Sequence, residues 1–178
     1  MQKRSLFASL VLLVFSMVVL AQQPPSPPQP GPAEKRLNYY VGKWHEEVDM
    51  KPGPFGPGGK GITNVSCEWF AGFHVVCHGD FSGAMGEGKE LSIFSYNRED
   101  KVYLYYAVNS WGETESAKGA VDGDTWTWHG DSKMNGKVIH GRFTYKEAPP
   151  DSASMKYEIQ GDDGKWNAVM EAKASRIK

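Results

Sequence analysis

The chain has 178 residues, of which 40% are hydrophobic, 23% charged and 12% aromatic, and its formal net charge is −1. This composition is typical of an ordinary folded protein and excludes collagen, coiled coil and disorder as the state of most of the chain. The 20 basic residues are balanced by 21 acidic residues and form no cluster beyond Lys3 and Arg4, so nucleic acid is not expected as a partner. One domain is expected at this length.

Residues 1–21 are typical of a secretory signal peptide. Lys3 and Arg4 precede an apolar run over 6–20, and the segment ends on the small side chain of Ala21. The run is shorter than the roughly 20 residues that a spanning helix needs, which favours cleavage over the alternative of a retained N-terminal anchor. We therefore expect an exported protein, periplasmic or secreted, with no stable membrane insertion after cleavage.

Residues 22–32 are predicted to form a proline-rich disordered linker. They contain six of the 11 prolines of the chain, and proline favours an extended spacer. A short helix is expected over 33–40, where Ala33-Glu34-Lys35-Arg36-Leu37 follows the prolines. The folded domain should therefore span 33–178.

From Tyr39 onward the sequence predicts strands, because aromatic and β-branched residues alternate with polar ones between clusters of Gly, Asp and Asn. Pairs such as Asp122-Gly123 favour tight hairpins, and no segment is long enough for a crossover helix. A meander of this kind leaves no unpaired edge strand if its first and last strands pair and close a barrel. The predicted fold class is therefore all-β, an up-and-down antiparallel barrel of about ten strands. The expected strands are 42–50, 61–70, 73–81, 89–97, 101–111, 114–121, 124–131, 137–146, 153–160 and 165–176.

The two cysteines predict a disulfide and a register. In an exported chain Cys67 and Cys77 are expected to be bonded, the alternative being two buried thiols. If the hairpin turns about Gly72, Cys67 faces Cys77 and Trp69 faces Val75, which places the apolar residues on one face. The disulfide and the apolar alternation thus favour the same pairing.

Several motifs of the chain resemble those of a known superfamily. Gly42-Lys43-Trp44 at the start of the first strand looks like the beginning of a calycin barrel, the superfamily of lipocalins and fatty-acid-binding proteins. The resemblance implies that Trp44 plugs the closed end and that a basic residue of the last strand, Arg176, packs over it. Further segments, Trp69-Phe70-Ala71-Gly72-Phe73 and Ile93-Phe94-Ser95-Tyr96-Asn97 with Lys101-Val102-Tyr103, extend the likeness to 37–178. Together they resemble the exported bacterial, lipocalin-like family called domain of unknown function 1579.

The same superfamily includes ten-stranded haem-binding nitrobindins, which begin with a similar motif. Their haem is held by a histidine near the end of the chain, whereas here no histidine lies beyond His140. No cofactor is therefore expected.

A ligand entrance is predicted at the end of the barrel opposite Trp44. The loops expected there are long and glycine-rich and carry Phe55, Met85 and Met134, as a mobile lid would; simple turns are the alternative. The loops in question are 51–60, 82–88, 112–113, 132–136 and 161–164. The alternation of apolar residues along the strands predicts which side chains point into the lumen, where they either line a cavity or fill the core. The predicted lumen residues are Trp69, Val75, Leu104, Tyr106, Val108, Trp126, Trp128, Ile139, Phe143, Tyr145, Tyr157 and Met170.

Polar groups give weaker signals. His140 and Arg142 share a strand face and are candidate anchors for the polar end of a ligand. The first hairpin groups Ser66, Glu68, His74, His78 and Asp80, which contain the elements of nucleophilic catalysis but are expected on a solvated outer face. His74 and His78 lie about 13 Å apart along a strand, too far to share a metal ion. No catalytic residue and no metal ligand is predicted.

The sequence favours an exported protein that binds a small, mostly apolar molecule in the barrel lumen. An interaction module with a solid core is one alternative, and an enzyme with a histidine base in the same cavity is another. The identity of the ligand and the oligomeric state do not follow from the sequence.

Overall fold

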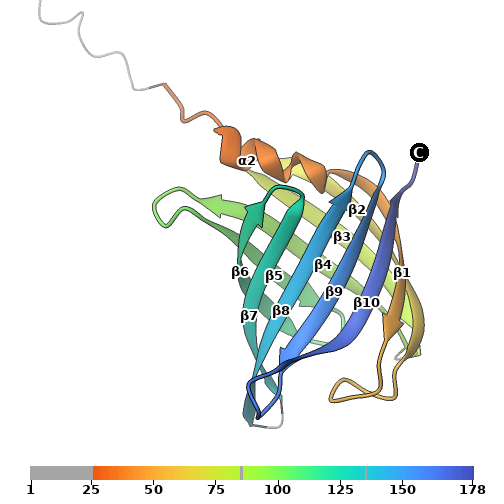
Figure 1. Ribbon diagram of the computed structural model, residues 1–178. Coiled ribbons are helices and arrows are strands. Elements are labelled where there is room, and N and C mark those ends of the chain that lie inside the picture. Colours follow the sequence, from red (N-terminus) through yellow and green to blue (C-terminus); the bar gives the residue numbers. More distant parts are fainter. Residues whose placement is uncertain (1–25, 85, 135) are drawn as a thin grey trace, which may run out of the picture.

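A computed structural model describes residues 26–84, 86–134 and 136–178 (Figure 1). Of Met134 it describes the backbone only. The predicted signal peptide and the start of the predicted linker lie outside the described residues, and so does Met85. Within the described part of the chain, no helix is long and apolar enough to cross a membrane.

Ten antiparallel strands of the described residues form a closed barrel, in which each strand pairs with its neighbours in sequence and β1 pairs with β10. Both the all-β class and the up-and-down topology are therefore confirmed. The strands are β1 Gly42–Met50, β2 Gly59–Phe70, β3 His74–Gly83, β4 Gly86–Asn97, β5 Val102–Asn109, β6 Thr114–Asp122, β7 Thr125–Met134, β8 Lys137–Ala148, β9 Ser152–Gln160 and β10 Trp166–Arg176.

The strand ends follow the turns that the sequence predicted. Gly123, Gly136 and Gly164 have φ values of 56°, 78° and 76°, the conformation that tight hairpins require and that glycine adopts without strain. Several strands are longer than expected, because pairing continues to the turn: β7 and β8 pair up to Met134 and Lys137.

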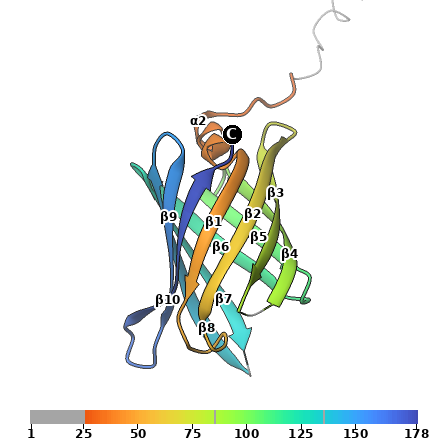
Figure 2. The same cartoon turned by 90° about the vertical axis from the view of Figure 1, so that its right-hand side faces the viewer.

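A short helical segment caps one end of the barrel (Figures 1 and 2). It consists of the α-helix α2 Pro32–Arg36 and the 3₁₀-helix η1 Leu37–Tyr39, where one helix over 33–40 was predicted. Pro32 stands at the first helical turn, and the Glu34 carboxylate accepts a hydrogen bond from the Gly31 N–H at 2.8 Å. Arg98, in the turn after β4, pairs with the same carboxylate and so fixes the cap to the barrel.

The core lies under this cap. Leu37 and Trp126 are 0% exposed, and Tyr40 stacks on Phe94 with ring centroids 4.3 Å apart. Trp126 and Trp128 of β7 stack on each other at 5.9 Å. The capped half of the barrel is therefore filled by aromatic side chains.

The β2–β3 hairpin confirms the predicted register. Cys67 pairs with Cys77 and Trp69 with Val75, and the two cysteines form a disulfide on the inner face. Ala71 and Gly72 in the turn have φ values of 52° and 74°. The bond therefore joins two neighbouring strands at the wall of the lumen.

Candidate functional site

The uncapped half of the barrel is hollow. A cavity of about 1290 Å³ extends from Tyr40, Trp44 and Trp128 near the core to loop residues such as Phe55 and Trp111 at the opposite end. That is the end at which the sequence predicts the entrance. This barrel of ten strands therefore encloses a cavity in addition to its packed core.

Aromatic side chains narrow the mouth of the cavity. Phe55, from the loop between β1 and β2, lies against Tyr157 with ring centroids 5.9 Å apart. Phe81 of β3 meets Trp111, in the loop between β5 and β6, edge to face at 4.9 Å. Of the three residues expected in a lid, Phe55 lines the cavity, Met85 lies outside the described residues, and the side chain of Met134 is not described.

Five of the twelve predicted lumen residues line the cavity with inward side chains: Trp128, Phe143, Tyr145, Tyr157 and Met170. Phe143 and Tyr157 belong to paired strands and stack at 4.1 Å. These residues give one side of the wall an apolar, largely aromatic surface.

Three other predicted lumen residues, Trp69, Val75 and Trp126, pack in the core instead. Val75 and Trp126 are 0% exposed in the cluster under the cap, and the Trp126 N–H donates to Glu147 at 2.7 Å. Trp69 packs against the same cluster and donates to Asn38 at 3.1 Å. They face inward, but at the filled end. Ile139 lies on the same face of β8 as Phe143, because the two are four residues apart, but it does not border the cavity.

The predicted phase of β5 is wrong. Tyr105 pairs with Phe94, which packs on Trp128, and Tyr105 therefore faces inward. Strand alternation then places Leu104, Tyr106 and Val108 on the outer face. Tyr106 and Val108 contribute to the wall of the cavity, yet each is 49% exposed. The residues of this strand are apolar in both phases, so the pattern gave no reliable choice of face.

The predicted anchors His140 and Arg142 are also misplaced, because they alternate with inward-facing Phe143. The Arg142 guanidinium donates to Glu158 at 2.7 Å and lies over Trp166 at 4.5 Å. The ring of His140 lies 2.7 Å from Asp131. Both side chains belong to ion pairs of the outer face and cannot orient a ligand in the lumen.

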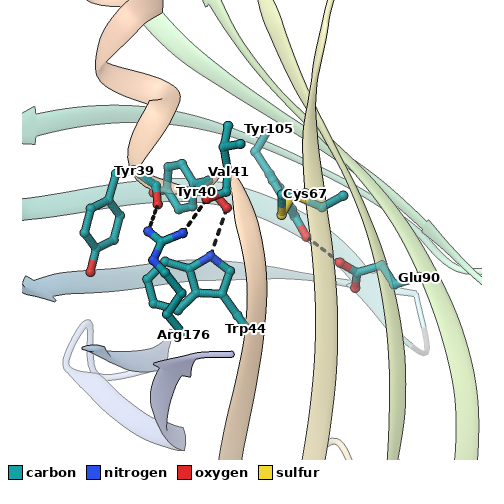
Figure 3. The surroundings of a disulfide bond; sticks show 9 residues. Tyr39, Tyr40, Val41, Trp44, Cys67, Glu90, Tyr105 and Arg176 are labelled. Atoms are coloured by element: carbon teal, nitrogen blue, oxygen red, sulfur yellow. Dashed lines mark hydrogen bonds between the residues drawn. A yellow bond between two sulfur atoms is a disulfide. The ribbon is translucent and has the colours of Figure 1, made fainter. Parts of the chain in front are cut away.

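The residues that the resemblance assigned to the closed end lie together there (Figure 3). The Arg176 guanidinium lies 4.2 Å from the centroid of Trp44, and it donates to the backbone carbonyls of Tyr39 and Val41. The Trp44 N–H donates to the Tyr40 carbonyl at 2.9 Å. Gly42 has a φ of 122°, and a Cβ atom there would collide with Arg176.

Three glutamates that were not predicted from the sequence also line the cavity. They are Glu46 of β1, Glu90 of β4 and Glu115 of β6. Each stands two residues from an inward-facing residue of its strand, so its side chain points into the lumen as well. We call them the lumen glutamates. Figure 3 shows Glu90 accepting a hydrogen bond from the Tyr105 hydroxyl, at 3.2 Å. The phase of the strands was the available signal: Glu46 stands two residues after Trp44.

Their surroundings disfavour charge. Burial, together with the nearby Glu90, raises the pKa of Glu46 to about 7, although His45 opposes the rise. Burial and the charges of Glu90 and Glu113 raise the pKa of Glu115 to about 7. Burial also raises the pKa of Glu90, against hydrogen bonds from Tyr105 and Ser92.

The inward tyrosines stay protonated in this environment. Burial and the carboxylates Glu90 and Glu115 raise the pKa of Tyr105 well above its usual value. Burial, with a further contribution from Glu115, raises the pKa of Tyr157 to about 12. Their hydroxyl groups are therefore neutral hydrogen-bond donors and acceptors at physiological pH.

The other polar groups considered from the sequence do not assemble a site. His74 and His78 lie on the outer face of β3, where the ring of His74 contacts the Ser95 hydroxyl at 2.8 Å. No histidine is among the described lining residues of the cavity. Within the described residues, no three potential ligands lie close enough together to hold a metal ion.

Comparisons with known proteins agree with the fold. The barrel is similar to the solved structure of Rv2717c from M. tuberculosis, with a TM-score of 0.62 and 15% identity over 83% of this chain and 99% of that one. It is also similar to the S-type phycobiliprotein lyase CPES from Guillardia theta, with a TM-score of 0.55 and 11% identity over 82% of this chain and 93% of that one. At these identities the likeness establishes the barrel fold and no activity. No curated protein sequence matches the chain. The model of the family described as "Protein of unknown function (DUF1579)" matches residues 29–176, and the chain therefore belongs to this family.

Proposed function

We propose that this chain is an exported binding protein that holds a small, mostly apolar molecule in the lumen of its barrel. The observation that carries the proposal is the cavity of about 1290 Å³ between the aromatic core and the mouth. Small-molecule sites typically measure about 300–1,000 Å³, so a drug-sized ligand fits with room for water. The disulfide between Cys67 and Cys77 supports an oxidising compartment, as export would provide.

Affinity would come mainly from burial of apolar surface. Phe143, Tyr157 and Met170 offer one apolar side of the wall, and Trp128 lies near the core. Each square ångström of apolar ligand surface removed from water would contribute about 25 cal/mol. Phe55 and Trp111 at the mouth would cover a bound molecule and slow its release.

Two observations disfavour the alternatives left open by the sequence. A solid-cored interaction module needs a filled lumen, whereas only the capped half is filled. An enzyme with a histidine base in the cavity needs a histidine there, and the described lining includes none.

A fluorescent probe tests the proposal. N-phenyl-1-naphthylamine is neutral and apolar, and its emission rises when it leaves water. Val48→Trp would place an indole in the lumen, whereas Glu47→Trp would place the same group on the outer face of β1, where Glu47 is exposed. Met170→Trp is a second filling variant from another strand.

We expect saturable binding to the wild-type chain and to Glu47→Trp, and at least about tenfold weaker binding to the two filling variants, since they remove contact area. Thermal unfolding of each variant would verify that it is folded. Equal binding to all four chains, or no binding to the wild type, would contradict the proposal.

A further inference from the structure

The lumen glutamates line the cavity without a basic partner, whereas the most deeply buried acids of the described residues, Glu34, Glu147 and Glu158, each form an ion pair. Within the described residues, no lysine, arginine or histidine lies within ion-pair distance of Glu46, Glu90 or Glu115. Several other acids of the described residues are paired at short range: Lys60 with Asp49 at 2.5 Å, Arg36 with Glu147 at 2.6 Å, Lys89 with Asp80 at 2.7 Å and Arg142 with Glu158 at 2.7 Å.

The rest of the cavity wall does not compensate for their charge. Among the described lining residues the only basic ones are Lys60 and Lys133, and Lys60 is bound to Asp49. Glu46 and Glu115 accept no hydrogen bond from any described residue, and Glu90 accepts hydrogen bonds only from the neutral hydroxyl groups of Tyr105 and Ser92. Carboxylates placed in this way cost stability, because burial disfavours the charged form and no partner restores it.

A second polar group of the wall also lacks a partner. The Tyr40 hydroxyl, at the inner end of the cavity, is buried and has no hydrogen-bond partner among the described residues, although the residue is only 7% exposed. The indole of Trp128 lies near enough to oppose the rise in the pKa of Tyr40 that burial causes, but no hydrogen bond of normal geometry joins the two groups. Buried hydroxyl groups normally have partners, so this one also points to a missing polar group.

The positions of the lumen glutamates indicate whether a metal ion or a larger molecule would neutralise their charge. They come from three strands, and no group of three potential ligands among the described residues is close enough to hold one metal ion. A molecule that spans the cavity meets this arrangement better than an ion. The ring faces of aromatic side chains such as Trp128, Phe143 and Tyr157 attract cations, and they also pack against apolar rings.

We propose that the cavity takes an organic cation, an apolar molecule with a protonated amine that the lumen glutamates bind. The inference rests on the proposed function and specifies the class of ligand. The ring system of the ligand lies against the aromatic wall, and its N–H groups donate charge-assisted hydrogen bonds to the carboxylates. An anionic ligand is rejected, because it would bring a further negative charge to the same wall.

The charge of the carboxylates, and hence this preference, depends on pH. The titratable and charged groups among the lining residues of the cavity are Tyr40, Glu46 of β1, Lys60 of β2, Glu90 of β4, Tyr105 and Tyr106 of β5, Glu115 of β6 with Glu113 in the preceding loop, Asp131 and Lys133 of β7, Tyr145 of β8 and Tyr157 of β9. Of these, Lys60, Asp131 and Lys133 alternate with inward-facing residues of their strands and lie on the outer face. The inner faces of β3 and β10 add no charged group among their lining residues. Since Glu46 and Glu115 have pKa values of about 7, both are largely ionised near pH 8 and protonated near pH 5.

Three probes of one shape test the inference by calorimetry. They are 1-naphthylmethylamine, 1-naphthylmethanol and 1-naphthoic acid, which carry a cationic, a neutral and an anionic group on the same ring. With the wild-type chain near pH 8 we expect the amine to bind at least about tenfold tighter than the alcohol, and the acid weaker than both. Near pH 5 the advantage of the amine over the alcohol should fall to about twofold or less.

Single variants assign the preference to the lumen. Glu46→Gln, Glu90→Gln and Glu115→Gln should each weaken binding of the amine about three- to tenfold and leave the alcohol unchanged. Glu47→Gln, on the exposed outer face of the same strand as Glu46, is the matched control and should change neither.

Each outcome separates the two proposals. Equal affinity of the alcohol and the amine near pH 8, or an effect of Glu47→Gln as large as that of the lumen variants, overturns the inference and leaves the binding function intact. Tighter binding of the acid overturns it in the same way. Binding of none of the three probes contradicts the inference and the proposed function together.

Discussion

Glu46 and Glu115 show how single residues of this barrel oppose its stability. Each carboxyl binds its proton more tightly in the folded chain than in the unfolded chain, because burial raises its pKa from 4.5 to about 7. The folded chain therefore holds more protons than the unfolded chain between these values, and the free energy of unfolding falls as pH rises through them. Their contribution is neutral below about pH 4.5 and fully unfavourable above about pH 7.

Glu46→Gln and Glu115→Gln should therefore stabilise the unliganded barrel in alkali. We expect a gain of about 1–3 kcal/mol near pH 8 for each, since one pKa unit corresponds to about 1.4 kcal/mol and partial exposure reduces the effect. Near pH 4.5 the gain should vanish. Urea unfolding at the two pH values measures it, and a gain of equal size at both would show that charge is not the cause.

The β2–β3 hairpin is the element that the disulfide supports. Cys67 and Cys77 are joined across adjacent strands and enclose a separation of 10 residues. The bond restricts the unfolded chain, and for a loop of this size the loop-entropy relation gives about 2–3 kcal/mol. The double variant Cys67→Ser/Cys77→Ser should lose that amount in urea unfolding. A midpoint that matches the oxidised wild type would show that the hairpin is fixed without the bond.

Strand β5 offers a matched pair of tyrosines on opposite faces. Tyr105 lies inward against Phe94 and Trp128, whereas Tyr106 is 49% exposed. Tyr105→Ala should cost about 3–5 kcal/mol of unfolding free energy, the range for large aromatic truncations in a core, and Tyr106→Ala less than about 1 kcal/mol. Denaturant unfolding of both variants checks the phase of the strand. A larger loss at Tyr106 would restore the phase first predicted from the sequence.

The elements also show what the sequence could predict. Strand positions followed from period-two alternation and from turns such as Asp122-Gly123, and the register of one hairpin followed from its cysteines. The face of β5 did not follow, because Leu104 to Val108 is apolar in both phases. Glu46 was overlooked for a related reason: a glutamate is expected in water, and only the position of its strand in the closed barrel turns it inward.

At the scale of the whole molecule, the barrel is divided between a filled half and a hollow half. The cap of α2 and η1, the stacked Trp126 and Trp128 and the Arg176–Trp44 contact lie at one end. The cavity of about 1290 Å³ occupies the other. The filled half supplies the hydrophobic stabilisation that lets the other half remain open and hold carboxylates that no described residue neutralises. We infer that the two halves have different roles, one in folding and one in binding.

Native mass spectrometry of the chain purified from its own host tests this account most directly. The mass would be compared with that calculated for residues 22–178, since cleavage after Ala21 is predicted. We expect a bound excess mass that leaves on denaturation, and a released molecule that carries a basic nitrogen. A bare chain in repeated measurements under gentle conditions would contradict the assignment of the cavity as a binding site.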